Sequence, residues 1–442
     1  MYPNLYYVFK DWFGIEWEVL KVLNTFGLMV AMGFVVAAIV ITSELRRKEK
    51  QGLLLPREEF ITVGKPASII DLLVNFLVGF VFGFKLFGLI FNKPAEMTPQ
   101  IYVFSAEGSI VGGLLLAIVL TGLKWWEKDK QKLKNPEQRS IRIWPHDRVG
   151  DIVILSLVFG ILGAKLFDNL ENWDDFIQNP IERIFSAGGL TFYGGLITVA
   201  IALAVYAKKK GIKLIHLVDA ISLAMLLAYA VGRIGCQVSG DGDWGIYNSA
   251  YITDDSGKVA EAKPREFEAH LELNKSYFLE GAVTDPGKTA PVYVTDRKSI
   301  SLETVPHKYV KALSFMPTWM VAYNYPQNVN NDGILIPGNT EDHNRVLPNP
   351  VFPTPFYETV VCTLLFLIVW AFRKRIKTAG IVTGIYFILN GIERFLIEKI
   401  RVNNQYHFWG INPSQAEIIS FFLILIGFIL IIAVQMKEVK KH

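Results

Sequence analysis

Long apolar blocks separated by polar loops dominate the chain. Nine of these blocks reach the ~20 residues that a helix needs to cross the hydrocarbon core of a bilayer. We expect transmembrane helices over residues 19–42, 66–91, 103–123, 149–169, 188–207, 214–236, 351–372, 379–400 and 414–436. The pattern therefore predicts an all-α polytopic membrane protein with about nine transmembrane helices.

The composition fits this class and argues against others. Of the 442 residues, 51% are hydrophobic, and only two are cysteines, which excludes a disulfide framework or a thiolate metal site. The histidines show no ligand spacing, so we expect no metal site. The first eighteen residues carry three acidic groups and lack the basic start of a cleavable signal peptide, which we therefore do not expect.

Lysine and arginine gather in every second loop between the predicted spans. Basic residues follow the first, third, fifth, seventh and last spans, whereas residues 168–187 hold five acidic groups and a single arginine, Arg183. Because basic loops of membrane proteins remain in the cytoplasm, we expect the amino terminus outside and the carboxyl terminus inside.

One internal repeat occurs at an offset of 80 residues. Asp71, Val78, Gly83, Lys85, Leu86 and Phe87 recur as Asp151, Val158, Gly163, Lys165, Leu166 and Phe167. Both copies run in the same direction across the membrane, so residues 66–123 are predicted to be a duplicated helix pair. Transporters more often repeat whole halves, frequently inverted, and this repeat covers too little of the chain for that plan.

Residues 237–350 form a long outer segment that is rich in polar and turn residues. It has only short strand-like runs, such as 292–294, and it is longer than a passive connection requires. We expect a small folded head of mixed secondary structure on the extracytoplasmic side, or a lid that handles the substrate. A disordered loop is the alternative, against which the segment offers apolar anchors at Phe315, Trp319, Tyr323 and Tyr325.

These patterns divide the chain into five predicted parts. They are an N-terminal span with a basic loop (1–65), the extra helix pair (66–123), core helices (124–236), the head or lid (237–350) and three C-terminal helices (351–442). The strongest polar signals inside apolar spans fall in the third and fifth parts.

The stretch from Gly232 to Gly245 closes an apolar run with one arginine, two carboxylates and five glycines. Ionisable groups at membrane depth are costly and usually face a cavity or a polar partner, so Arg233 is a candidate functional residue. The glycines allow the backbone to approach a ligand closely. The alternative is an arginine that extends to the membrane surface, followed by a flexible exit loop.

A second polar stretch covers residues 391–401. Arg394 and Glu398 lie four residues apart, share one helix face and can pair, while Glu393 and Arg401 extend the polar character. A purely structural ion pair is the alternative. A guanidinium group can donate two parallel hydrogen bonds to two oxygens of one phosphate. Two arginines that converge from different helices therefore predict an anion-binding site.

Residues 186–196 lead into the fifth span through a Gly-rich turn that contains Tyr193. Gly194 and Gly195 would let the backbone approach a ligand or a neighbouring helix. An aromatic residue at this level is equally expected to be a simple interface anchor.

Residues 353–358 open the seventh span with Pro-Thr-Pro-Phe-Tyr-Glu. Prolines suit the start of a helix, and Glu358 suits its positive end. A purely structural role at the helix start is therefore a strong alternative for this motif.

Taken in order, these motifs resemble prolipoprotein diacylglyceryl transferases. The resemblance covers the first span and about 149–245 and 351–436. It implies a seven-helix core in the bacterial inner membrane that moves a diacylglyceryl group from phosphatidylglycerol to the lipobox cysteine thiol of a prolipoprotein. A thioether forms and glycerol 1-phosphate is released. The implied partners are these two substrates and the bilayer, with no nucleic acid and no cofactor, and the active site faces the periplasm.

The resemblance also assigns site residues. Arg233 matches the phospholipid-binding arginine, Asp241 the acidic residue of the same signature, Arg394 and Glu398 the essential arginine and glutamate, and Tyr357 the tyrosine of the Tyr-Glu pair. We expect catalytic roles for Arg394, Glu398, Tyr193 and Asp241, and phosphatidylglycerol binding by Arg233, Arg394, Gly194, Gly195 and Tyr357.

Three positions depart from the family pattern. Tyr193 stands where many members have a histidine proposed as the base, Cys236 where many have asparagine, and Phe26 where many have tyrosine. A tyrosine with an unperturbed pKa of ~10 acts as a base only if that pKa is strongly lowered. A lipid or anion transporter, and a catalytically inactive homologue that serves as a receptor or scaffold, are the two alternatives in other functional classes.

Overall fold

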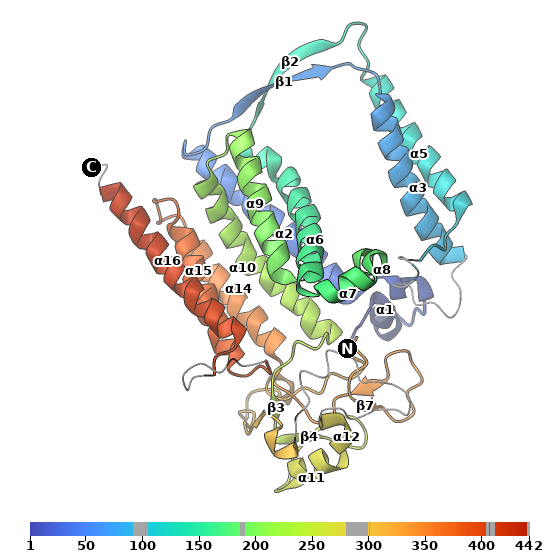
Figure 1. The fold of residues 1–442 in the computed structure, drawn as a ribbon, viewed down its shortest axis with the longest axis vertical. Helices are drawn as coiled ribbons and strands as arrows, with labels where there is room; N and C mark the ends of the chain where they lie inside the picture. The colour runs from blue at the N-terminus through green and yellow to red at the C-terminus, as the bar shows by residue number, and fades with distance from the viewer. Residues whose placement is uncertain are drawn as a thin grey trace. The chain divides into compact units, whose positions relative to one another are not determined.

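The computed structural model describes residues 1–91, 102, 105–185, 191–279, 299, 301–403, 406 and 412–439. The chain is mostly helical and divides into two compact units (Figure 1). The first unit comprises Met1–Glu16, Leu23–Ile41 and Val218–His442, and the second comprises Trp17–Val22 and Thr42–Leu217.

Seven helices within the described residues are long and apolar enough to cross a membrane. They are α2 (Thr25–Lys50), α3 (Ile69–Phe91), α5 (Ile110–Lys130), Pro145–Glu171 with α6 (Val149–Glu171), α10 (Leu214–Ser239), α14 (Thr354–Phe372) and α16 (Gln415–Val439). The predicted all-α polytopic class is confirmed. The other two predicted spans contain the 19-residue α9 (Phe192–Lys210) and the 18-residue α15 (Ile381–Glu398), so the count of nine stays a prediction.

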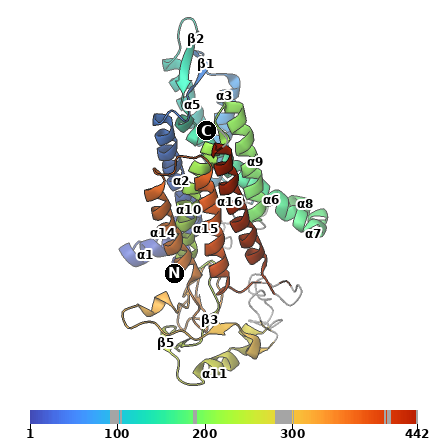
Figure 2. The ribbon, with the colours of Figure 1, turned by 90° about the vertical axis from the view of Figure 1, so that its left-hand side faces the viewer.

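In the first unit, α14, α15 and α16 lie side by side (Figures 1 and 2). Small residues bring α15 and α16 together. A Cβ atom built on Gly391 would lie 2.8 Å from the carbonyl oxygen of Ser420, and one on Gly384 would lie 3.0 Å from that of Gly427. Such close backbone approach is typical of membrane helix pairs. Lipid chains are as apolar as the helix side chains, so close packing of small residues holds these helices together in place of the hydrophobic effect.

The described residues of the 237–350 segment form a folded head with its own apolar core. Its elements are β3 (Tyr247–Asn248), β4 (Tyr251–Thr253), β5 (Val259–Glu261), α11 (Glu266–Leu273), α12 (Lys275–Phe278), η3 (Leu302–Thr304), β6 (His307–Lys308), η4 (Thr318–Met320), β7 (Ile334–Leu335) and β8 (Arg345–Val346). Strands β3 and β6 pair in parallel, whereas β4 with β5 and β7 with β8 are antiparallel.

Aromatic side chains fill the core of this head. Trp244, Tyr247, Phe278 and Tyr325 are buried together, and the rings of Trp244 and Tyr325 lie 4.8 Å apart. Of the predicted anchors, Tyr325 belongs to this core, but Phe315 is 79% exposed and does not. The predicted strand-like run 292–294 lies outside the described residues. The described part of the head is folded, as the sequence predicted. The N-terminal helix α1 (Leu5–Phe13) contacts it through an ion pair between Lys10 and Glu341.

The second unit contains two helix pairs of the same design, α3 with α5 and α6 with α9. In the first pair, a Cβ atom on Gly112 would lie 3.0 Å from the carbonyl oxygen of Gly83. In the second pair, a Cβ atom on Gly194 would lie 2.6 Å from the carbonyl oxygen of Gly163. The α3–α5 pair therefore has the same kind of close glycine contact as the α6–α9 pair, and the duplication of one pair from the other stays a prediction.

Short elements connect these pairs. Strands β1 (Arg57–Val63) and β2 (Glu137–Ile143) form an antiparallel ribbon, with Arg57 opposite Ile143 and Val63 opposite Glu137. The remaining short helices are η1 (Glu18–Val22), η2 (Pro145–Arg148), α7 (Trp173–Gln178) and α8 (Pro180–Phe185).

Candidate functional site

Arg233 lies near the end of α10 with its side chain only 11% exposed. Its Nε atom donates a hydrogen bond to the hydroxyl of Tyr229 at 3.0 Å and lies 2.5 Å from Oε2 of Glu358. A guanidinium removed from water needs such partners, because its desolvation costs several kcal/mol. The structure therefore shows Arg233 as a buried, paired arginine and not as one that extends to the membrane surface.

Glu358, near the start of α14, is the centre of the cluster. Its side chain is fully buried and contacts three arginines. Its Oε1 atom accepts a hydrogen bond from Arg233 Nη2 at 3.3 Å, lies 3.3 Å from Arg394 Nη1 and lies 3.7 Å from Arg401 Nη1. One carboxylate thus holds three positive charges from two parts of the chain in one place.

A Gly-rich loop after α10 adds a second carboxylate. Gly240 and Gly242 have φ angles of 67° and 96°, which glycine adopts without the strain that a side chain would cause. The loop places Asp243 between two arginines. Its Oδ2 atom pairs with Arg233 Nη1, and its Oδ1 atom lies 2.7 Å from Arg401 Nη2.

The end of this loop is fixed by backbone contacts on both sides. The N–H of Gly245 donates to the carbonyl of Phe352 at 2.8 Å, and that of Ile246 donates to the carbonyl of Ile400 at 2.8 Å. A Cβ atom on Gly245 would lie 2.6 Å from the Ile400 oxygen, so a larger residue does not fit. Glycine here lets the loop pass between the segments that carry Glu358 and Arg401.

Arg394 is the most accessible arginine of the cluster. Its side chain is 27% exposed, compared with 11% for each of the other two. Its Nη2 atom lies 3.4 Å from Oε2 of Glu398, one helical turn along α15. Glu398 is held in turn by Asn403 and Ser414, which donate hydrogen bonds to Oε1 at 2.6 Å each. Arg394 is therefore positioned from two sides and still reaches the surface of the cluster.

The two acids of the Gly-rich loop have opposite electrostatic environments. Burial opposes ionisation of Asp243, but Arg401 and Arg233 outweigh it and hold the pKa of that carboxyl well below its usual range. Burial and the negative charge of Asp243 raise the pKa of Asp241. Asp241 is thus the acid of this loop that more readily takes up a proton.

Asp241, Asp243 and Cys236 offer ligand atoms within 4.8 Å of one another, a spacing that a metal ion could bridge. Arginines already engage two of them. Asp243 pairs with Arg233 and Arg401, and Arg233 Nη1 donates to Cys236 Sγ at 3.5 Å. These positive charges disfavour a cation at the same place, so we assign the three groups to the arginine cluster.

Four other predicted site residues have contacts of their own. Tyr357 donates its hydroxyl to the carbonyl of Met320 in the head at 2.6 Å, and thereby ties the start of α14 to the head. Tyr193 lies in the first turn of α9 and is 38% exposed. Gly194 and Gly195 both lie at the crossing of α9 with α6. Roles of these four residues toward a lipid stay predictions, and the Gly-rich turn 186–190 before them is outside the described residues.

The sequence does not single out Glu358, Asp243 or Arg401 as site residues. Glu358 fits an ordinary charge at a helix start, and the resemblance points to Asp241 instead of Asp243. Arg401 is marked in the sequence only as one more charge of the polar stretch 391–401, and α15 ends before it, at Glu398. For the two acids, only the fold shows which arginines they meet.

Fold and cluster together define a class. The chain is a polytopic helical membrane protein in which three arginines share two carboxylates between the ends of neighbouring helices. A sequence model of the family described as "Prolipoprotein diacylglyceryl transferase" matches residues 128–433, and the chain belongs to this family.

Relatives support this assignment over most of the chain. The chain is 26% identical over 292 residues to the phosphatidylglycerol–prolipoprotein diacylglyceryl transferase of Finegoldia magna, a match that covers 66% of this chain and 80% of the relative. With the protein of the same name from Streptococcus agalactiae it is 24% identical over 326 residues, or 73% and 88% of the two chains. A shorter match to that of Streptococcus mutans is 32% identical over 127 residues and covers 28% of this chain and 44% of the relative.

Proposed function

We propose that the protein transfers a diacylglyceryl group from phosphatidylglycerol to the lipobox cysteine thiol of a prolipoprotein. The products are a thioether-linked lipoprotein precursor and glycerol 1-phosphate, which is the first step of lipoprotein maturation. Family membership supports the reaction class. The observation that carries the proposal is the convergence of Arg233, Arg394 and Arg401 on Glu358.

The reaction breaks the bond between the glyceryl carbon and its phosphate oxygen. The cysteine sulfur attacks that carbon as a thiolate, because a thiol of pKa ~8.5 is a poor nucleophile while protonated. The electron pair of the broken bond leaves with the phosphate, whose negative charge requires stabilisation. Arginines fixed in advance provide it at no cost of rearrangement.

The residues of the cluster divide this work. Arg394, as the most accessible arginine, binds the phosphate together with Arg233, while Glu398 positions Arg394. Asp241 accepts the thiol proton, since burial and the negative charge of Asp243 raise its pKa. Tyr193 assists by hydrogen bonding to the lipid head or to the thiol. No cofactor takes part.

The surroundings follow from the same proposal. The alternation of basic loops supports an inner-membrane protein with its amino terminus outside and its carboxyl terminus in the cytoplasm. The cluster then lies towards the periplasmic face, where the head would meet prolipoproteins. In this proposal the chain has five parts. They are the N-terminal span with its basic loop (1–65), the extra helix pair (66–123), the core helices (124–236), the head or lid (237–350) and the three C-terminal helices (351–442).

A transfer assay tests the proposal. The full chain, in vesicles that contain phosphatidylglycerol, is incubated with a lipobox peptide, and the thioether product is measured by mass spectrometry. We expect product with phosphatidylglycerol and none with phosphatidylcholine. Arg233→Ala and Arg394→Ala should each abolish it, whereas Arg375→Ala, at the other end of α14, should not.

Each alternative gives a different result. A transporter would move lipid without forming a thioether, and an inactive homologue would bind the peptide without product. Full transfer by both cluster variants would remove the site assignment while leaving the activity in place.

A further inference from the structure

Four basic side chains end helix α2, and they are used unequally. Arg47 pairs with Glu44, with Nε 2.9 Å from Oε2, and Lys48 is buried and donates to the carbonyl of His216 at 3.3 Å. The other two are Arg46 and Lys50. Both are exposed, and neither has a hydrogen-bond or ion-pair partner among the residues that the structure describes.

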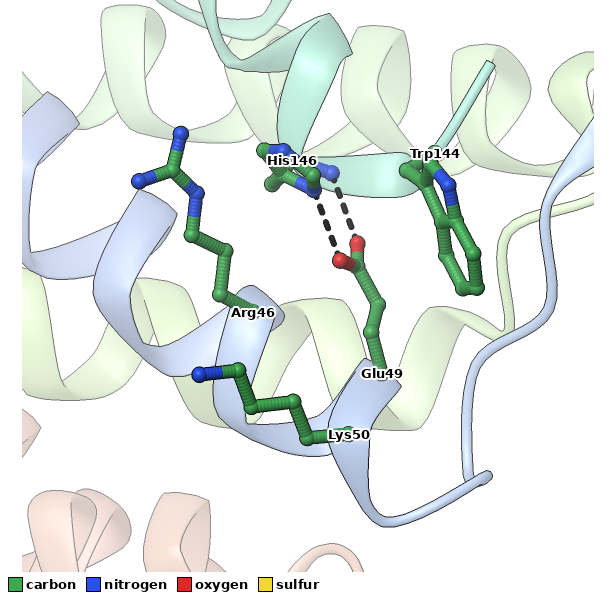
Figure 3. Close-up of a pocket in the computed structure, with 5 residues that line it drawn as sticks. All are labelled: Arg46, Glu49, Lys50, Trp144 and His146. Atoms are coloured by element: carbon green, nitrogen blue, oxygen red, sulfur yellow. Dashed lines mark hydrogen bonds and ion pairs between the residues drawn. The ribbon is translucent and has the colours of Figure 1, made fainter. Parts of the chain in front are cut away.

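These two cations line a cavity of about 290 Å³ within the second unit. Its other lining residues are Glu49, Trp144 and His146 (Figure 3). In the close-up, Arg46 and Lys50 extend on one side, the Trp144 ring flanks the other, and the pair of Glu49 with His146 lies between them. The cavity thus combines two positive charges with an amphipathic aromatic ring.

The one acid that lines the cavity makes its contacts with His146 and not with Arg46 or Lys50. Glu49 is engaged by His146, whose backbone N–H donates to Oε1 at 2.9 Å and whose Nδ1 lies 2.6 Å from Oε2. Arg46 and Lys50 are four residues apart on one helix face, where like charges destabilise each other. An anion between them would relieve this repulsion.

The position along α2 indicates which kind of anion is near. The apolar span was predicted to end at residue 42, whereas the helix continues to Lys50, at the level expected for lipid head groups. Tryptophan concentrates at this level of a membrane, and basic pockets there bind anionic head groups.

We propose that this cavity binds the phosphate group of an anionic phospholipid, with Arg46 and Lys50 as the charge partners and Trp144 against the glycerol backbone. The site uses no residue of the arginine cluster and does not depend on the transfer reaction. A free phosphate ion has the same charge chemistry, so the experiment must separate the two sources.

Native mass spectrometry of the full chain in detergent, titrated with phosphatidylglycerol or phosphatidylcholine, provides the test. The variant Arg46→Gln/Lys50→Gln keeps polar side chains and removes both charges. Since the arginine cluster is itself proposed to bind phosphatidylglycerol, all titrations use the Arg233→Ala/Arg394→Ala chain as the background. There, loss of Arg46 and Lys50 should weaken phosphatidylglycerol binding about 30-fold, the combined effect of two cations at a membrane surface. The control Lys208→Gln/Lys209→Gln removes the same charge from the end of α9 and should bind as the original chain does. Trp144→Ala should weaken binding without changing net charge.

Three outcomes would overturn the proposal. The first is unchanged phosphatidylglycerol binding by the Arg46/Lys50 variant with normal helicity by circular dichroism, and the second is an equal loss in the Lys208/Lys209 control. In a separate arm, inorganic phosphate is titrated calorimetrically into the chain in phosphatidylcholine nanodiscs. The third outcome is phosphate binding that is as tight as lipid binding and that added phosphatidylglycerol does not reduce. It would assign the site to the free ion.

Discussion

Arg233 and Arg394 come from different helices, yet each places a guanidinium nitrogen 3.3 Å from the same oxygen of Glu358. The carboxylate holds the two positive charges together before any substrate arrives. Since catalysis by charge stabilisation depends on groups already in place, this arrangement makes Glu358 a positioning residue for both arginines.

Glu358→Gln should therefore lower both stability and transfer. Removing one partner from a buried ionic cluster costs ~3–5 kcal/mol, because the remaining charges stay buried and unpaired. We expect a clearly lower melting temperature and transfer reduced by about 100-fold or more, consistent with the loss of one fixed electrostatic group. Glu272→Gln, which affects an exposed pair with Lys275, is the control and should change neither. A Glu358→Gln variant as stable as the original chain would contradict the central role of this carboxylate.

Asp241→Asn and Asp243→Asn should change stability in opposite directions. Arg401 and Arg233 stabilise the ionised form of Asp243, so its amide should unfold at a lower temperature near neutral pH. Ionised Asp241 is opposed by burial and by Asp243, so its amide should unfold at a higher temperature while reducing transfer. Thermal unfolding of the two variants measures both changes. Melting temperatures that shift in the same direction would contradict the assignment.

The pH dependence of these two effects follows from the directions of the pKa shifts. Because the pKa of Asp243 is lowered on folding, its stabilising contribution is present above the unfolded value of ~3.9 and is lost as the pH falls further. Because that of Asp241 is raised, its cost appears only as the pH rises above the same value. In melting curves recorded from pH 3 to 7, the Asp241→Asn difference should therefore be lost by about pH 4, whereas the Asp243→Asn difference should only begin to shrink there. An Asp243→Asn difference as large at pH 3 as at pH 7 would be inconsistent with the ion pairs.

The sequence predicted the membrane class and the repeat because both depend on local patterns, namely block length and residue spacing. It also singled out Arg233 and Arg394, since a charge inside an apolar span is conspicuous. Glu358 and Asp243 were not conspicuous, because acids are ordinary at a helix start and in a loop. Their role depends on which chain segments meet in space, and no spacing along the chain records that.

Gly83→Ala tests the glycine crossing of the duplicated pair. A Cβ atom there would collide with the backbone carbonyl of Gly112, so we expect a loss of about 1–3 kcal/mol, as for overpacking in a core. Gly163→Ala should behave alike in the second pair. Gly122→Ala, where nothing lies within 4 Å, should instead stabilise α5 by up to ~1 kcal/mol. Thermal unfolding compares all three, and equal effects of Gly83→Ala and Gly122→Ala would argue against the close contact.

Tyr193→Phe tests the residue that is expected to stand at the position of the family histidine. If the hydroxyl takes part in proton transfer, its removal should slow thioether formation by about 100-fold or more. Tyr206→Phe removes a hydroxyl from the same helix that bonds Asp151, and it should leave the rate unchanged. An unaltered rate in the Tyr193 variant would identify its ring as an interface anchor.

The pairing of α3 with α5 indicates how a membrane protein can gain additional helices. These helices pack mainly against each other, and their glycine contacts resemble those of the α6–α9 pair further along the polypeptide. A hairpin that brings its own interior contacts asks little of its neighbours. Copying such a hairpin extends a membrane protein by two passes, preserves the sidedness of everything downstream, and leaves the inherited chemistry where it was.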